Sequence, residues 1–147
     1  MKNLIIIALF ICTLFSCTKD YTKDYVEEIE FDIDQFPQKW ELIEMSGNIQ
    51  NSVTIGANMA WQEYYLLDAN GTFIKHREQD GLVMEASGSF SFGENSYGKY
   101  LRLNYITDNK IIGSCRSQEE SLGFDSNRLR SSWWACCGPG LLYKKTE

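Results

Sequence analysis

The sequence predicts an all-β protein, an up-and-down antiparallel β-barrel of eight or nine strands that follows a cleaved N-terminal signal. Three observations predict this fold. Short runs with alternating apolar residues recur roughly every ten residues, and turn-forming residues separate them. Aromatic residues make up 14% of the chain and there are only two prolines, which favours β structure with a well-filled interior. No stretch shows the period of a convincing amphipathic helix.

The first seventeen residues predict export. A positively charged start, with Lys2, precedes the apolar run Leu4–Phe15. This run is typical of a secretory signal and shorter than the roughly 20 residues that cross a bilayer. The ending Leu14-Phe15-Ser16-Cys17 resembles the bacterial lipobox. The resemblance implies cleavage after residue 16 and acylation of Cys17, whereas an ordinary signal with a chance cysteine is the alternative.

An acidic segment follows the signal. Residues 17–36 carry a small duplication, Thr-Lys-Asp-Tyr at 18–21 and again at 22–25, and every charged residue that follows it in the segment is acidic. Such composition predicts a solvated tether that lifts the folded domain off the bilayer. The alternative is an export signal, because Lys19-Asp20 partly resembles the motif that follows the lipidated cysteine in some surface-displayed lipoproteins of Bacteroidota.

The barrel domain is expected over residues 37–147. Asn70-Gly71 between two apolar runs predicts a hairpin, because both residues tolerate positive φ. Ser46–Met59 is expected to form a loop over the barrel mouth. The clearest alternation places Leu82 and every second residue through Phe92 on one face. The expected strands are Gln38–Met45, Trp61–Leu67, Thr72–Arg77, Leu82–Phe92, Tyr100–Ile106, Lys110–Cys115, Glu120–Phe124, Arg128–Trp134 and Leu141–Lys145.

The cysteines of the domain fit an oxidising compartment. Cys115, Cys136 and Cys137 remain after the signal and the lipidated residue, which allows one disulfide at most. We favour Cys115 with Cys136, because adjacent cysteines close a strained ring. The alternative is that all three are small buried apolar residues.

The charge of the chain excludes several partners. The formal net charge is −6, and no basic patch is present. Binding of nucleic acid depends on clustered Lys and Arg, so a nucleic-acid partner is not expected. Electrostatic docking on anionic lipid is not expected either, so membrane contact would rest on the acyl chains of Cys17.

The domain resembles the lipocalin-like domains of Bacteroidota lipoproteins. The resemblance covers about residues 37–145, and it rests on Lys39-Trp40-Glu41-Leu42, on residues 59–65 leading into Asp68-Ala69-Asn70-Gly71-Thr72-Phe73, and on Trp134-Ala135-Cys136-Cys137-Gly138-Pro139-Gly140. It implies a lipocalin-like β-barrel that binds at most a small apolar ligand. The expected location is the cell envelope, lipid-anchored at the outer membrane on the periplasmic face or the cell surface.

Catalysis is not predicted. His76, the only histidine, stands in a strand between two cations, which is typical of a surface residue. Glu41, Glu63 and Glu85 are interpreted as outer-face acids, because no motif links them into a pair of facing carboxylates. A zinc site needs three or four ligands, so neither metal nor cofactor is expected.

The aromatic residues are the candidate ligand site. They could line a cavity or fill the barrel, and alternation alone does not separate these alternatives. The first hypothesis is binding of a small, largely apolar ligand inside the barrel, and the second is a protein-interaction module, an accessory subunit or an inhibitor, with a filled barrel. The candidate ligand-binding residues are Trp40, Trp61, Phe73, Phe90, Phe92, Tyr105 and Trp133.

Overall fold

The computed structural model describes residues 35–47, 49, 51–106, 110–116, 118–136 and 138–146. The predicted signal at 1–16, the lipidation site Cys17, nearly all of the tether and Cys137 lie outside these residues. No helix in the described part of the chain is long and apolar enough to cross a membrane.

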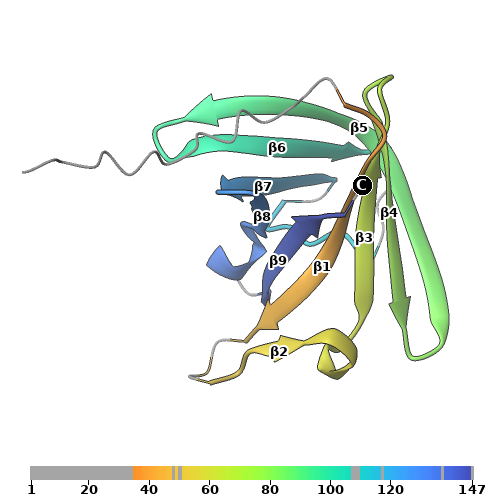
Figure 1. Ribbon diagram of the computed structural model, residues 1–147, viewed down its shortest axis with the longest axis vertical. Helices are drawn as coiled ribbons and strands as arrows, with labels where there is room; N and C mark the ends of the chain where they lie inside the picture. Colours follow the sequence, from red (N-terminus) through yellow and green to blue (C-terminus); the bar gives the residue numbers. More distant parts are fainter. Residues whose placement is uncertain are drawn as a thin grey trace, which may run out of the picture.

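Nine strands and two short 3₁₀ helices make up the described chain (Figure 1). They are β1 (Gln38–Ser46), β2 (Thr54–Ile55), η1 (Gly56–Asn58), β3 (Gln62–Leu67), β4 (Thr72–Gln79), β5 (Leu82–Asn95), β6 (Gly98–Tyr105), β7 (Glu119–Asp125), β8 (Arg128–Ser131), η2 (Trp133–Ala135) and β9 (Gly140–Lys145).

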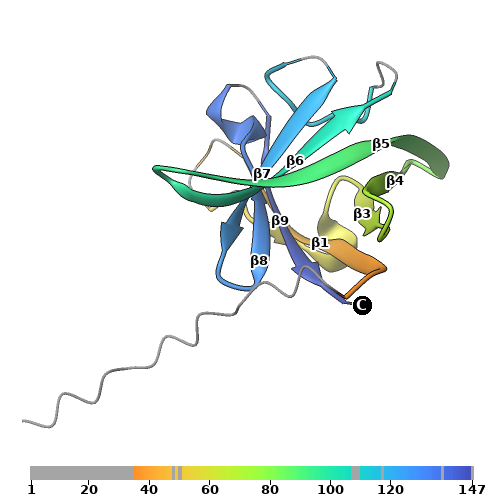
Figure 2. The ribbon, with the colours of Figure 1, turned by 90° about the horizontal axis from the view of Figure 1, so that it is seen from above.

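The strands form a closed barrel, which confirms the predicted fold class. Consecutive strands pair antiparallel from β3 to β9, and β1 pairs with both β3 and β9 to close an eight-stranded, up-and-down barrel. The last strand meets the first along Trp40↔Lys145 and onward to Ser46↔Gly140. Closure leaves the eight barrel strands without a free edge. The view from above shows the strands arranged around a common centre (Figure 2).

The remaining strand, β2, lies outside the closed barrel. The first part of β1 pairs with β3, from Gln38↔Leu67 to Glu41↔Tyr64. The later part pairs with the two-residue strand β2 at Glu44 and Met45. Ser46–Met59, expected as a loop, therefore contains β2 and η1, and these elements lie at the lower end of the barrel in Figure 1.

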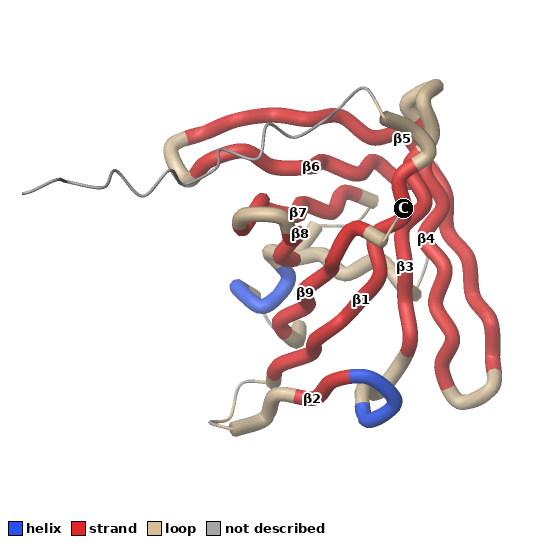
Figure 3. The backbone as a smooth tube through the Cα atoms, in the orientation of Figure 1, coloured by secondary structure: helices blue, strands red, loops and turns tan. Residues whose placement is uncertain are grey.

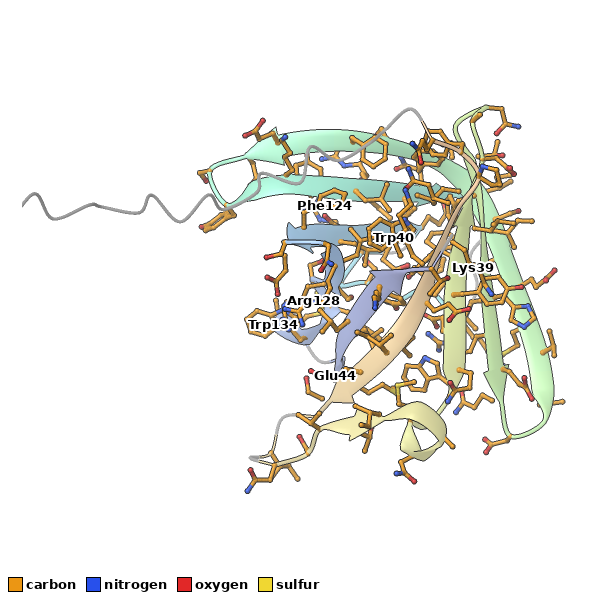
Figure 4. All side chains as sticks on the ribbon, viewed as in Figure 1. Lys39, Trp40, Glu44, Phe124, Arg128 and Trp134 are labelled. Carbon is orange, nitrogen blue, oxygen red and sulfur yellow. A yellow bond between two sulfur atoms is a disulfide. The ribbon has the colours of Figure 1, made fainter. Side chains whose placement is uncertain are left out.

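The alternation predicted for Leu82–Phe92 matches the burial of β5 from Met84 onward, whereas Leu82 itself is 66% exposed. In β5, Met84, Ala86, Gly88, Phe90 and Phe92 are buried or half-buried, while the residues between them are exposed. In β6, every second residue from Leu101 to Tyr105 is buried. These inner faces meet those of the other strands in one core. Figure 4 shows the side chains of this core between the strands, with Trp40 among them and Trp134 at the periphery.

The hairpin turns follow local sequence. The predicted turn at Asn70-Gly71 joins β3 to β4, and Gly71 has φ of 80°. A second tight turn, at Asp80-Gly81, joins β4 to β5 and was not predicted. Its φ angles of 53° and 76° require residues that tolerate the left-handed region, as Asp and Gly do.

Two predicted strand segments are wrong. Lys110–Cys115 forms turns and irregular chain, because the Ile111 carbonyl accepts a hydrogen bond from the Arg77 side chain and the segment packs against the barrel interior. The strand predicted at Arg128–Trp134 ends at Ser131, and η2 follows. Figure 3 shows both 3₁₀ helices as short turns between strands.

Candidate functional site

Four charged side chains meet inside the barrel. Lys75 and Arg77 come from β4, Glu63 from β3 and Glu120 from β7, and no more than 4% of any of these residues is exposed. Lys75 and Arg77 follow the buried Phe73 at every second position of β4. Strand alternation therefore places all three side chains on the same face. The interior therefore contains two positive and two negative groups.

Lys75 joins the two carboxylates. Its Nζ lies 3.2 Å from Oε1 of Glu63, and 3.1 and 3.2 Å from Oε1 and Oε2 of Glu120. Strands β5 and β6 separate β4 from β7 in the sheet, so the contact with Glu120 runs through the barrel interior. This ammonium group links opposite walls of the barrel.

Hydrogen bonds satisfy the remaining carboxylate oxygens. The Tyr143 hydroxyl donates to Oε1 of Glu63 at 2.6 Å, and Arg77 Nε donates to Oε2 of the same group. The Tyr105 hydroxyl donates to Oε2 of Glu120. All four oxygens thus accept at least one bond, which is the condition for tolerating ion pairs in a low-dielectric interior.

Burial keeps the tyrosines of this cluster protonated. Desolvation raises the pKa of Tyr65, Tyr105 and Tyr143 well above 10, and the negative charges of Glu120 and Glu63 raise these pKa values further. Tyr105 and Tyr143 therefore remain hydrogen-bond donors to the carboxylates over the whole physiological pH range. We name these four charged residues and three tyrosines the interior cluster.

The segment 110–116 covers the interior cluster. Arg77 Nη2 donates to the Ile111 carbonyl at 3.2 Å, and Ile111 is buried. A Cβ on Gly113 would meet Oε1 of Glu120 at 2.6 Å, so this part of the chain lies directly against the cluster. The disulfide between Cys115 and Cys136, the pairing that the sequence favours, fastens the segment next to η2.

The placement of the acidic residues corrects one expectation. Glu63 was expected on the outer face together with Glu41 and Glu85, yet its side chain is fully buried, whereas the other two side chains are 42% and 61% exposed. Its register partner Arg77 explains the difference, because the two residues face each other inside the barrel. His76 lies on the outside, stacked on Tyr64, with Nδ1 3.2 Å from Glu85.

The predicted aromatic residues fall into separate packing groups. Phe90 and Phe92 pack together with ring centroids 5.6 Å apart, against Phe36 and Phe124. Trp40 is buried and contacts Phe124 edge-on. This group fills the core beneath the β5–β6 hairpin.

The other predicted aromatic residues lie elsewhere. Phe73 and Tyr105 pack edge to face, with ring centroids 4.9 Å apart. Trp133 belongs to η2 and packs against the backbone of Gly138 so closely that a Cβ there would collide with the indole. Trp61 covers Arg77, whose guanidinium carbon is 4.2 Å from the ring centroid. The seven residues are thus distributed over the core, one side of the barrel and one end.

A groove of about 410 Å³ opens at the end of the barrel where Trp61 lies. Residues 56–57, 59–62 and 78–81 line it, so η1 and the following segment form one wall and the β4–β5 turn forms the other. The indole Nε1–H of Trp61 is buried and has no acceptor among the described residues. Local sequence signals do not reveal this groove, because it depends on how η1 packs beside the β4–β5 turn.

The described residues contain no group of three or more His, Cys, Asp and Glu side chains placed to hold a metal ion. The interior cluster itself has its carboxylates occupied by Lys75, Arg77 and tyrosine donors, so its chemistry is that of a structural ion network. No protein-family model matches the chain, and neither the curated proteins nor the solved structures searched include a significant match.

Proposed function

We propose that this protein is a lipid-anchored binding module of the cell envelope that recognises a partner protein with the end of its barrel. The observation that carries the proposal is the contrast between interior and end. The interior is occupied by a paired ion network and packed rings, whereas an open groove with exposed apolar neighbours lies at one end.

A small apolar ligand inside the barrel is less well supported. Such a ligand would lie against Lys75, Glu63 and Glu120, whose charges are buried and mutually paired. Separating such charges without water costs several kcal/mol for each ion. An apolar molecule offers no hydrogen bonds in exchange, so the interaction module becomes the preferred function of the two that the sequence suggests.

The anchor rests on the sequence alone. The lipobox-like Leu14-Phe15-Ser16-Cys17 supports acylation of Cys17 and a location at the outer membrane. Cys17→Ser is expected to abolish labelling with radioactive palmitate and to release the protein from the membrane fraction. Labelling that persists in this variant would overturn the lipoprotein assignment.

The partner proposal is tested by cross-linking in intact cells that produce the protein. A cross-linkable group is placed near the groove, and we expect it to give a discrete adduct of constant mass. The same protein without that group is expected to give no adduct. As the competing test, the purified domain is titrated with fatty acids, sterols, haem and aromatic metabolites. Saturable tryptophan quenching by one of these compounds, in the absence of any adduct, would favour the ligand-binding function instead.

A further inference from the structure

The groove at the end of the barrel has a chemical character that suggests its occupant. Glu78 and Asp80 are the only charged residues that line it, and both are exposed. Neither forms an ion pair with another described residue. With a formal net charge of −6 on the chain, the groove favours a positively charged group and repels an anionic one.

The sides of the groove are apolar. Met59 is buried at its base, and Trp61 contributes an indole ring to its lining. In the chain, Ile55 comes directly before the wall that begins at Gly56, and Leu82 and Val83 come directly after the wall that ends at Gly81. These three residues are 61%, 66% and 61% exposed. Exposed apolar residues gathered at a concave surface mark an interaction site more often than scattered ones do.

Both walls of the groove are held by contacts with the rest of the barrel. Arg77 stacks on Trp61 and is itself held by Glu63 and by the Ile111 carbonyl, so the interior cluster supports the indole from behind. The opposite wall is a two-residue hairpin turn between Gln79 and Leu82, which are register partners. A preformed site avoids the ordering cost that weakens flexible ones.

The position of the groove suits a partner protein. The chain enters the barrel at Gln38, which pairs with Leu67 beside the β3–β4 turn, and β9 ends nearby at Lys145. Figure 1 shows this end at the top and η1 with the β4–β5 turn at the bottom. The groove therefore opens at the end of the barrel opposite to the chain leading to the proposed anchor.

We propose that this groove docks an exposed segment of a partner protein that carries Lys or Arg flanked by apolar residues. The cation lies between Glu78 and Asp80, and the flanking residues cover Ile55 and Leu82. The inference rests on the proposed function, since it names the chemistry of the partner and the surface that recognises it.

The first test uses defined peptides and the ¹H–¹⁵N signal of the Trp61 indole, assigned by its loss in Trp61→Phe. The probes are blocked pentapeptides of alternating leucine and lysine, or the same with glutamate or glutamine in place of lysine. We expect the lysine peptide to shift the signal saturably and the glutamate peptide to leave it unchanged. Equal responses to all three peptides, or none, would overturn the proposal.

The second test removes the charges. Glu78→Gln with Asp80→Asn keeps the shape of both side chains and is expected to weaken binding of the lysine peptide about tenfold. The matched control, Asp68→Asn with Glu94→Gln, removes the same charge from the β3–β4 turn and from β5 away from the groove, and is expected to leave the affinity unchanged. If both variants lost the same affinity for the lysine peptide, the loss would follow from the net charge of the chain, and the groove would be overturned as the binding site.

Cross-linking in cells distinguishes failure of the docking site from failure of the proposed function. A partner adduct that disappears in Glu78→Gln/Asp80→Asn and persists in the control supports the groove as the docking site. An adduct that persists in both variants overturns the groove and leaves the proposed function standing. If the wild-type chain gives no adduct, the proposed function fails and the docking site fails with it.

Discussion

Lys75 is the residue on which the interior cluster depends. It contacts both buried carboxylates, and its own side chain is fully buried. Lys75→Met keeps much of the side-chain volume but leaves Glu63 and Glu120 without their shared cation. Removing one partner from a buried ion pair costs about 3–5 kcal/mol, and we expect a loss in this range in the free energy of unfolding measured with urea.

The matched control is Lys39→Met, in an ion pair with Glu41 on the barrel surface. The two side chains are 27% and 42% exposed, and such pairs contribute below about 1 kcal/mol. If Lys75→Met destabilised the protein no more than Lys39→Met, the interior cluster would contribute nothing beyond filling space.

The buried tyrosines predict a loss of stability in alkali. Burial and the neighbouring carboxylates raise the pKa of Tyr65, Tyr105 and Tyr143 above 10, while the same phenols ionise near 10 once the chain unfolds. Above about pH 10 the unfolded state therefore binds fewer protons than the folded state, and the free energy of unfolding falls as the pH rises. Each phenol contributes about 1.4 kcal/mol per pH unit until its folded-state pKa is reached.

Urea unfolding between pH 8 and 11 measures this dependence. We expect the stability to be insensitive to these phenols below about pH 10 and to fall above it. Tyr65→Phe removes one titrating group with a raised pKa and should reduce the slope. An unchanged slope in Tyr65→Phe would contradict the assignment.

The pattern around Lys75 predicts the strand but does not show which of its charged side chains point into the barrel. Phe73, Lys75 and Arg77 alternate with His76, so they share a face whichever way the strand is turned. Charged residues are ordinarily exposed, which led to the expectation that Glu63 points outward. Its burial depends on Lys75 and Arg77, and the second carboxylate of the cluster is 45 residues from Lys75 in the chain.

At the scale of elements, the β4–β5–β6 sheet requires a glycine at one position. Gly88 pairs with Phe73 on one side and Tyr105 on the other. A Cβ there would collide with the backbone carbonyl of Asn104 and approach the ring of Phe73. Gly88→Ala must therefore separate β5 from β6 locally, and we expect a loss of about 2 kcal/mol or more in the free energy of unfolding.

Gly123 in β7 is the matched control for this change. It is also a strand glycine, and a Cβ there would meet no atom within 4 Å. Gly123→Ala is expected to be neutral or to stabilise the protein by up to about 1 kcal/mol, because alanine restricts the unfolded chain. Similar losses in both variants would mean that strand glycines matter here for their flexibility and not for close approach.

Sequence predicted the elements whose signals are local. Asn70-Gly71 fixes a hairpin by itself, and the alternation of β5 extends over enough residues to assign its inner face. The strand predicted at Lys110–Cys115 is wrong because the apolar Ile111 and Ile112 resemble a strand, while the actual partners of this segment are Arg77 and Glu120 of the interior cluster. Such partners become visible only when the barrel closes.

At the scale of the whole molecule, closure brings the two ends of the barrel domain together. Trp40 pairs with Lys145, and the backbone amide of Thr146 donates to the Lys39 carbonyl. The interior cluster depends on this closure, because its residues come from β3, β4, β6, β7 and β9. The candidate site could therefore not be predicted before the strand order was known.

The adjacent ends predict that a circular permutant will fold. A short Gly/Ser linker from Thr146 to Pro37, with new ends in the β5–β6 turn between Ser96 and Tyr97, interrupts no strand pair. We expect this permutant to unfold in one cooperative transition, with tryptophan fluorescence and far-UV circular dichroism coinciding. Exposed loop tips tolerate such openings because few contacts cross them.

A second permutant provides the control, with its new ends between Ile74 and Lys75 in the middle of β4. This opening breaks a strand that pairs on both sides and separates Phe73 from the cations on the same inner face. It is expected to abolish the cooperative transition. If the loop-opened permutant failed to fold as well, the pairing of β1 with β9, even with its ends linked, would not suffice to hold the barrel closed without an intact β5–β6 turn.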